Sequence, residues 1–233
     1  MSSGKISEQQ VAALKTKVEA EEKRFFKELY EEGQWLPCGE KENAKLFYRD
    51  DPDTGIKKFK IDARVPTRLQ DVLDALFIEK NRVGWEPLID GMKTIEDFGE
   101  NHTMHHITTK SIAMVVGRRD FVHFRRIRGP DGIDKKENQT DARVVVDIST
   151  EHPDYPANTW TFTRGTTLFS ATIFREYCID GKYSVTYESI TQSNINGYVP
   201  GWLINMVTTS STIEWYNSME GCAIDLMKKR EKK

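Results

Sequence analysis

The stretch VGRRDFVHFRRIRG, residues 116–129, decides the fold of this chain. From Phe121 onward its pattern has period two, which is typical of a β-strand. The two faces of that strand carry alternate residues, Phe121, His123, Arg125 and Ile127 on one and Val122, Phe124, Arg126 and Arg128 on the other. Both faces carry cations, and an arginine on a buried face has to be paired, reach solvent or face a cavity. The stretch therefore predicts a sheet that curves around something other than a solid core.

Composition excludes several classes of protein. The 233 residues carry a formal net charge of −2 and 38% hydrophobic residues, which suits one large domain, or one domain with a helical extension. Acidic and basic residues are interspersed, so no nucleic-acid partner is expected. The odd number of cysteines, without a C-x-x-C pair, favours free thiols in a reducing compartment. The absence of an apolar signal segment or membrane span predicts a cytoplasmic protein.

The N-terminal residues 6–32 have the spacing of an amphipathic helix. Ser7 is the expected N-cap and Gly33 the expected stop. The apolar stripe consists of Val11, Leu14, Val18, Phe25, Phe26 and Leu29. The helix can dock on the domain or pair with a helix of a partner protein. Docking is favoured, although Glu21 and Glu22 interrupt the stripe.

The rest of the chain predicts an α+β protein with an antiparallel sheet. Residues 45–63 suggest a hairpin, and a helix is expected to begin at Pro66 and to end near Asn81. At least six short strands follow between residues 85 and 195, joined by hairpin-sized connections. A long helix, 200–229, is expected to close one mouth of the curved sheet.

A series of motifs from about residue 66 to the C-terminus resembles, in order and spacing, the StAR-related lipid-transfer (START) family. The matching motifs are Arg82-x-x-Trp85-Glu86, Arg119-Asp120-Phe121-Val122 with Arg125, Val144-Val145-Val146 leading to Glu151-His152-Pro153, Val185-Thr186-Tyr187, and Pro200-Gly201-Trp202-Leu203-Ile204-Asn205. The match is nearest to phosphatidylcholine-transfer-type members.

The resemblance implies a helix-grip fold. In this fold a curved antiparallel sheet wraps around a long C-terminal helix, and an apolar tunnel lies between the sheet and the helix. Residues 34–233 would form this lipid-binding domain, and residues 1–33 a helix that is part of it or appended to it. The implied activity is non-enzymatic binding and transfer of a sterol, phospholipid or ceramide, without a cofactor. The C-terminal helix and a neighbouring loop would act as the gate during transient contact with a membrane.

Arg125 matches an arginine that many members bury beside a carboxylate one strand away. The position aligned with that carboxylate is His106, so the usual partner is missing. A symmetric hairpin register would place Asp147 opposite His123, diagonal to Arg125 and on the same face. Alternatively, Arg125, His123 and His106 receive a counterion from the ligand, namely a phosphate. Pairing with Asp147 is favoured, and the two arrangements can coexist.

Arg82 and Glu86 match the residues that surround the phosphate in phosphatidylcholine-transfer relatives. Their i, i+4 spacing is equally that of a plain surface ion pair. The aromatic cage that recognises choline in those relatives is poorly kept, because Phe121 holds one position and Thr108 stands where an aromatic is expected. Selective choline binding is therefore not expected.

Three further residues complete the expected lipid-binding set. Tyr187 ends one of the matching motifs, and Trp202 and Met206 lie in the expected C-terminal helix. Inward aromatic residues of such a fold serve both as core and as ligand wall.

Neither a metal site nor a catalytic centre is expected. His102, His105 and His106 are close in sequence, but on a strand His105 faces away from the other two, and no carboxylate or cysteine lies beside them at ligand spacing. No G-x-S-x-G or catalytic cysteine signature occurs. Enzymatic activity rests only on analogy with cyclases of similar fold.

The sequence thus predicts a protein that holds one lipid, with a glycerophospholipid as the first choice. A sterol or ceramide carrier is an alternative. Another is a lipid-sensing module whose N-terminal helix relays occupancy to a partner protein.

Overall fold

A computed structural model describes residues 4–31, 35–111, 116–157, 159–197 and 210–232. Its elements, in chain order, are α1 (Glu8–Leu29), β1 (Leu36–Lys41), β2 (Ala44–Arg49), β3 (Lys58–Val65), α2 (Leu69–Phe77), α3 (Glu79–Trp85), β4 (Ile89–Asp97), β5 (His102–Thr109), β6 (Arg119–Arg128), β7 (Gln139–Ser149), β8 (Thr163–Arg164), β9 (Thr166–Ile179), β10 (Lys182–Asn194) and α5 (Ser210–Glu231). The prediction of at least six strands between residues 85 and 195 is confirmed, since β4 to β10 lie there.

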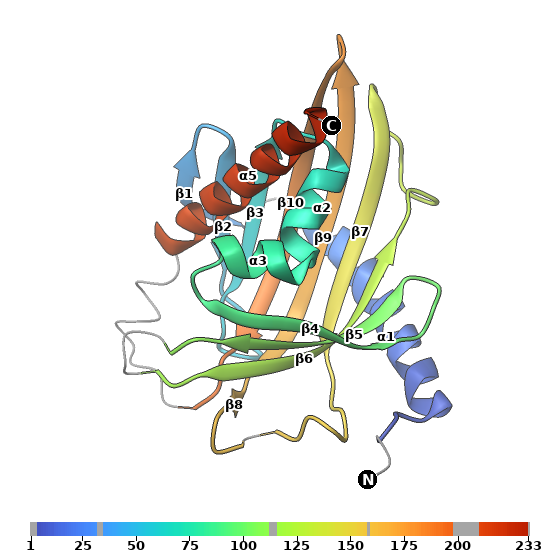
Figure 1. Ribbon diagram of the computed structural model, residues 1–233, viewed down its shortest axis with the longest axis vertical. Helices are drawn as coiled ribbons and strands as arrows, with labels where there is room; N and C mark the ends of the chain where they lie inside the picture. Colours follow the sequence, from blue (N-terminus) through green and yellow to red (C-terminus); the bar gives the residue numbers. More distant parts are fainter. Residues whose placement is uncertain (1–3, 32–34, 112–115, 158, 198–209, 233) are drawn as a thin grey trace.

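All ten strands join one curved sheet in the order β1-β2-β3-β10-β9-β7-β6-β5-β4, with β8 beside β6 (Figure 1). The neighbours along this path are antiparallel, and only the short β6–β8 pairing is parallel among the described strands. The fold is therefore α+β, with the antiparallel arrangement that the sequence predicts.

The sheet has helices on both faces, and each face has its own core. We call the face that α2, α3 and α5 cover the inner face, and the face that α1 covers the outer face (Figure 1). Strand alternation assigns neighbouring residues to different cores: Val145 packs in the inner cluster, whereas Val144 and Val146 pack in the outer one. No described helix is both long and apolar enough to cross a membrane.

Helix α1 begins where the sequence predicts. The backbone N–H of Gln10 donates to the Ser7 hydroxyl (3.3 Å), and the backbone N–H of Ser7 donates to the Gln10 side chain (2.8 Å). This reciprocal capping box satisfies two amides of the first turn. Val18 and Phe25 are fully buried in the outer core, so docking of the helix on the sheet is confirmed. The expected stop at Gly33 lies outside the described residues.

The interruption of the apolar stripe at Glu22 has a structural reason. Its carboxylate faces the sheet and accepts hydrogen bonds from Arg128 Nε (2.6 Å) and Arg126 Nη1 (3.3 Å). One turn and a half further along the helix, Glu28 accepts from Lys58 Nζ (2.9 Å) in the same way. The two outer-face arginines of β6 are thus paired with a carboxylate of α1. This pairing explains how cations can lie on that face of the strand.

The helix predicted from Pro66 to Asn81 is instead two helices, α2 and α3, and the first begins three residues later than predicted. Ile78 separates them with an extended backbone (φ −86°, ψ 115°). This break folds α3 back onto α2, where the Trp85 indole N–H donates to the carbonyl of Ala75 (2.9 Å).

Helix α5 forms the described part of the helix predicted at 200–229, and it lies across α2 and α3 (Figure 1). Tyr216 and Met219 are fully buried between α5 and the inner face. The basic end is held by Arg230, which pairs with Asp74 of α2 (2.9 Å). Residues 198–209, which include the predicted lipid contacts Trp202 and Met206, lie outside the described part.

Candidate functional site

The centre of the inner face is an ion pair between neighbouring strands. Arg125 Nε and Nη2 donate to the two carboxylate oxygens of Asp147 at 2.8 and 3.3 Å, so the predicted internal pairing is confirmed. The predicted register is wrong, because Asp147 lies opposite Arg125 itself and Ser149 lies opposite His123. The reason is that the turn is not symmetric: residues 139–143 extend β7 beyond the end of β6 and pair with β9.

Arg125 is buried, with 5% of its surface exposed, and its guanidinium lies 4.4 Å from the centre of the Phe77 ring. Burial raises the pKa of Asp147, but the charge of Arg125 and its hydrogen bonds outweigh it, so the pKa lies below its usual value. The pair is therefore ionised. Within the described residues, Arg125 Nη1 has no hydrogen-bond partner. A charged donor thus remains available on the inner face.

Two histidines lie beside this pair, opposite each other on β5 and β6. Burial lowers the pKa of His105 to about 3 and that of His123 to about 4, so both rings are neutral at physiological pH. His105 Nε2 lies 2.7 Å from the Thr103 hydroxyl, and His123 Nε2 lies 2.8 Å from the Thr167 hydroxyl. In the described part of the chain, His123 Nδ1 has no partner, and no three His, Cys, Asp or Glu side chains are grouped as metal ligands.

His106 does not belong to this group, and its assignment there is wrong. It lies opposite Val122 on β6, which places it on the outer face. Its Nε2 lies 3.0 Å from Asp120 Oδ2, and its ring packs on Tyr155 with centroids 4.5 Å apart. The neighbouring His105 occupies the inner position instead, because a shift of one residue along a strand changes the face.

The remaining predicted contacts divide between the two faces. Thr108 lies opposite Asp120 and therefore falls on the outer face, away from Arg125, so its assignment to the site is also wrong. Phe121 is on the inner face, 5.7 Å from the His123 ring. Tyr187 is buried there too, where burial raises its pKa.

Arg82 and Glu86 form a second ion pair, contributed by helix α3. Arg82 Nη2 lies 2.8 Å from Glu86 Oε2, and both side chains are largely buried. The guanidinium packs against two indole rings that also contact each other, 4.7 Å from the centroid of Trp85 and 5.3 Å from that of Trp215. Burial lowers the pKa of Arg82 and raises that of Glu86. The interpretation of this pair as a plain surface ion pair is therefore wrong.

Sequence reasoning missed Trp215, which connects this pair to α5. Its indole N–H donates to Glu86 Oε2. The available signal was its place beside Tyr216 in the apolar stripe of the final helix. The charges of Arg125 and Asp147 also act on Arg82, so the two ion pairs are electrostatic neighbours. The site thus combines two balanced ion pairs, two neutral histidines and several aromatic rings.

We expect the Trp215→Phe variant to lower the free energy of unfolding by about 1–3 kcal/mol, because buried Glu86 loses a donor while an aromatic ring is kept. Urea denaturation measures the change. Trp160→Phe is the matched control, since Trp160 is fully exposed. Equal midpoints for the two variants would contradict the role of the Trp215 N–H.

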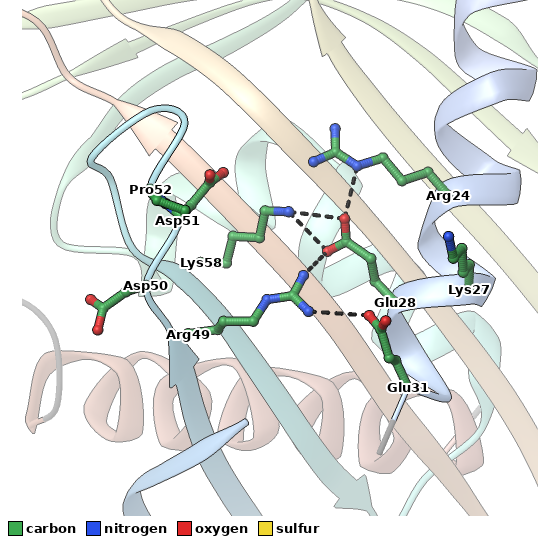
Figure 2. A pocket seen from close by; sticks show the side chains of 9 residues that line it. All are labelled: Arg24, Lys27, Glu28, Glu31, Arg49, Asp50, Asp51, Pro52 and Lys58. Atoms are coloured by element: carbon green, nitrogen blue, oxygen red, sulfur yellow. Dashed lines mark hydrogen bonds and ion pairs between the residues drawn. The ribbon is translucent and has the colours of Figure 1, made fainter. Parts of the chain in front are cut away.

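A cavity of about 370 Å³ lies on the outer side, between α1 and the β2–β3 connection. Charged side chains line it, as Figure 2 shows, and Glu28 accepts from Arg24, Arg49 and Lys58 there. A wall of paired charges does not suit an apolar ligand. This cavity therefore belongs to the docking of α1 and not to the inner-face site.

Comparison with known proteins agrees with this architecture. The START domain family model matches residues 16–222. Human StAR-related lipid transfer protein 5 superposes with a TM-score of 0.77 at 17% identity, covering 92% of this chain and 98% of the other. Human STARD10 superposes with a TM-score of 0.73 at 15% identity, covering 99% of this chain and 85% of the other. No curated protein sequence matches the chain. From the family match, which includes most of its length, the chain belongs to the START domain family.

Proposed function

We propose that this protein binds one lipid molecule, a glycerophospholipid, between the inner face and helices α2, α3 and α5, and carries it between membranes. Membership of the START domain family supports lipid binding, and the similar human fold is named a lipid transfer protein. Transfer without catalysis and a cytoplasmic location stay predictions from the sequence.

The observation that carries the choice of lipid is the spare donor of Arg125. A buried N–H without an acceptor costs about 1–3 kcal/mol, so Nη1 favours a ligand that supplies an oxygen. A phosphate oxygen makes a short, charge-assisted hydrogen bond with a guanidinium. The free Nδ1 of His123 lies on the same face and can donate a second bond in the appropriate tautomer. A sterol hydroxyl is uncharged, so its hydrogen bond to the guanidinium would lack the charge that a phosphate supplies.

The aromatic side chains of the inner face suit the acyl chains. Phe77, Phe121 and Tyr187 lie around the polar centre. Each methylene of an acyl chain costs about 0.8 kcal/mol to expose to water, so a carried lipid has to stay covered by such side chains or by a bilayer. A polar centre surrounded by apolar walls is the arrangement that an amphipathic ligand requires.

Native mass spectrometry of the purified protein, with identification of the extracted lipid, tests this proposal. We expect a one-to-one adduct with the mass of a phospholipid. The double variant Arg125→Met with Asp147→Leu removes both charges together and is expected to lose phospholipid while remaining folded. Delipidated protein that takes up sterol or ceramide from vesicles but no phospholipid would contradict the choice of ligand.

A second candidate is a lipid-sensing module in which α1 relays occupancy to a partner protein. The observation in its favour is that Glu22 of α1 pairs with Arg126 of β6, the strand that carries Arg125 on its opposite face. Identical partner binding by the lipid-loaded and the empty protein would argue against it.

A further inference from the structure

Trp160 presents its whole side chain to solvent. Its relative exposure is 107%, and the next most exposed large apolar residue of the described part, Tyr30, reaches 56%. Tryptophan has the largest apolar surface of any side chain and is normally at least partly covered. An indole held in water on the surface is therefore a candidate for contact with another body.

Phe162, two residues after Trp160 in the chain, is linked by contacts and hydrogen bonds to three other surface segments. The Arg118 guanidinium lies 4.5 Å from the centre of the Phe162 ring, and Arg118 Nε donates to the carbonyl of Thr109 (3.4 Å). The adjacent Lys110 is exposed, and its backbone N–H donates to the carbonyl of Leu88 (2.9 Å), a residue 37% exposed. We call the surface formed by Leu88, Lys110, Arg118, Trp160 and Phe162 the docking patch.

The base of the docking patch is rigidly attached to the sheet. Arg119 donates to the carbonyls of Ile195 (3.1 Å) and Asn196 (2.8 Å), and the Asn196 side chain donates to the carbonyl of Arg164 (2.9 Å). These bonds tie the start of β6 and the end of β10 to β8, which follows Trp160 in the chain. The strand that follows Trp160 is therefore held by hydrogen bonds at one end of the sheet.

We propose that the docking patch binds the surface of a bilayer that contains anionic phospholipids. Indole rings favour the boundary between headgroups and acyl chains, and lysine and arginine are attracted to anionic headgroups. Of the two cations, Arg118 is paired with Asp90, so Lys110 supplies the excess positive charge of the patch. This inference rests on the proposed lipid transfer, because a carrier has to meet a membrane to load and release its ligand.

Flotation with vesicles of phosphatidylcholine, with and without phosphatidylserine, tests the patch. We expect the wild type to bind the anionic vesicles more tightly. Trp160→Ala is expected to weaken binding about ten-fold, because a large apolar side chain no longer inserts. Lys110→Gln is expected to weaken binding about five-fold, and only when phosphatidylserine is present.

The control is Ile179→Ala. Ile179, the last residue of β9, is 48% exposed beside the β9–β10 turn, at the end of the sheet opposite to β8, and its replacement should leave vesicle binding unchanged (Figure 1). The Trp160→Ala variant should retain its lipid in native mass spectra while transferring a fluorescent phospholipid more slowly than the wild type.

The outcomes separate the two proposals. If the wild type carries a lipid but Trp160→Ala binds vesicles as tightly as the wild type, the docking patch is overturned and the proposed lipid carriage stands. The same holds if Trp160 proves necessary for binding a protein and not for binding vesicles. Protein that takes up no lipid, although its vesicle binding depends on Trp160, overturns the proposed carriage and leaves the docking patch.

Discussion

Replacing Asp147 by alanine is expected to lower the free energy of unfolding by about 3–5 kcal/mol. Arg125 would then keep its charge on the buried inner face without the carboxylate that now accepts two of its hydrogen bonds. The loss of a partner costs more than the pair contributes, because the remaining ion stays desolvated. Guanidinium denaturation followed by circular dichroism measures the change.

Two variants make this prediction specific. The double variant Arg125→Met with Asp147→Leu should recover most of the lost stability, since no unpaired charge remains. Glu100→Ala breaks the Lys15–Glu100 pair, which has the same 2.8 Å distance but lies at the surface, and should leave the midpoint unchanged. Equal effects of Asp147→Ala and Glu100→Ala would show that burial does not determine the strength of the Arg125 pair.

The second large effect concerns pH. The free energy of unfolding is expected to fall steadily as the pH is lowered from 6.5, the ordinary pKa of histidine, to about 4, the pKa of His123. Over this range the unfolded chain binds protons on His105 and His123, whereas the folded protein does not. Acid therefore favours the unfolded state, by about 1.4 kcal/mol per pH unit for each of the two rings. The stabilisation is complete above pH 6.5.

Asp147 contributes in the same direction, because its lowered pKa means that its stabilisation is also lost as the pH falls. Urea denaturation at a series of pH values gives the slope. His123→Gln should flatten it by the contribution of one ring, and the non-titrating Ile179→Ala should leave it unchanged. A His123→Gln variant with the wild-type slope would contradict the burial of that ring.

Local patterns predict the elements of this fold well. Alternation in residues 121–128 identifies a strand and the composition of its faces, because side-chain direction follows from backbone geometry alone. The start of α1 is equally local, since Ser7 and Gln10 satisfy each other's backbone amides within one turn. Glu22, in contrast, looks like a defect of the helix until the arginines of β6 are placed beneath it.

Relations between elements are where sequence reasoning fails. The Arg125–Asp147 pair was predicted, but its register depends on how far β7 continues along β9, which no turn residue specifies. His105 and His106 exchange roles through a shift of one position. Trp215 could not be assigned to Glu86, because the helical pattern of α5 does not specify which α3 side chain it meets.

The pairing of β3 with β10 has a consequence for biosynthesis. A ribosome delivers α1 and the first three strands long before β10 exists, and Glu22 precedes its arginine partners by 104 and 106 residues. Until β6 and β10 emerge, the apolar side of α1 and the edge of β3 that pairs with β10 stay uncovered. Folding therefore has to wait for the last third of the chain, a topology that makes folding slow and gives chaperones an early substrate.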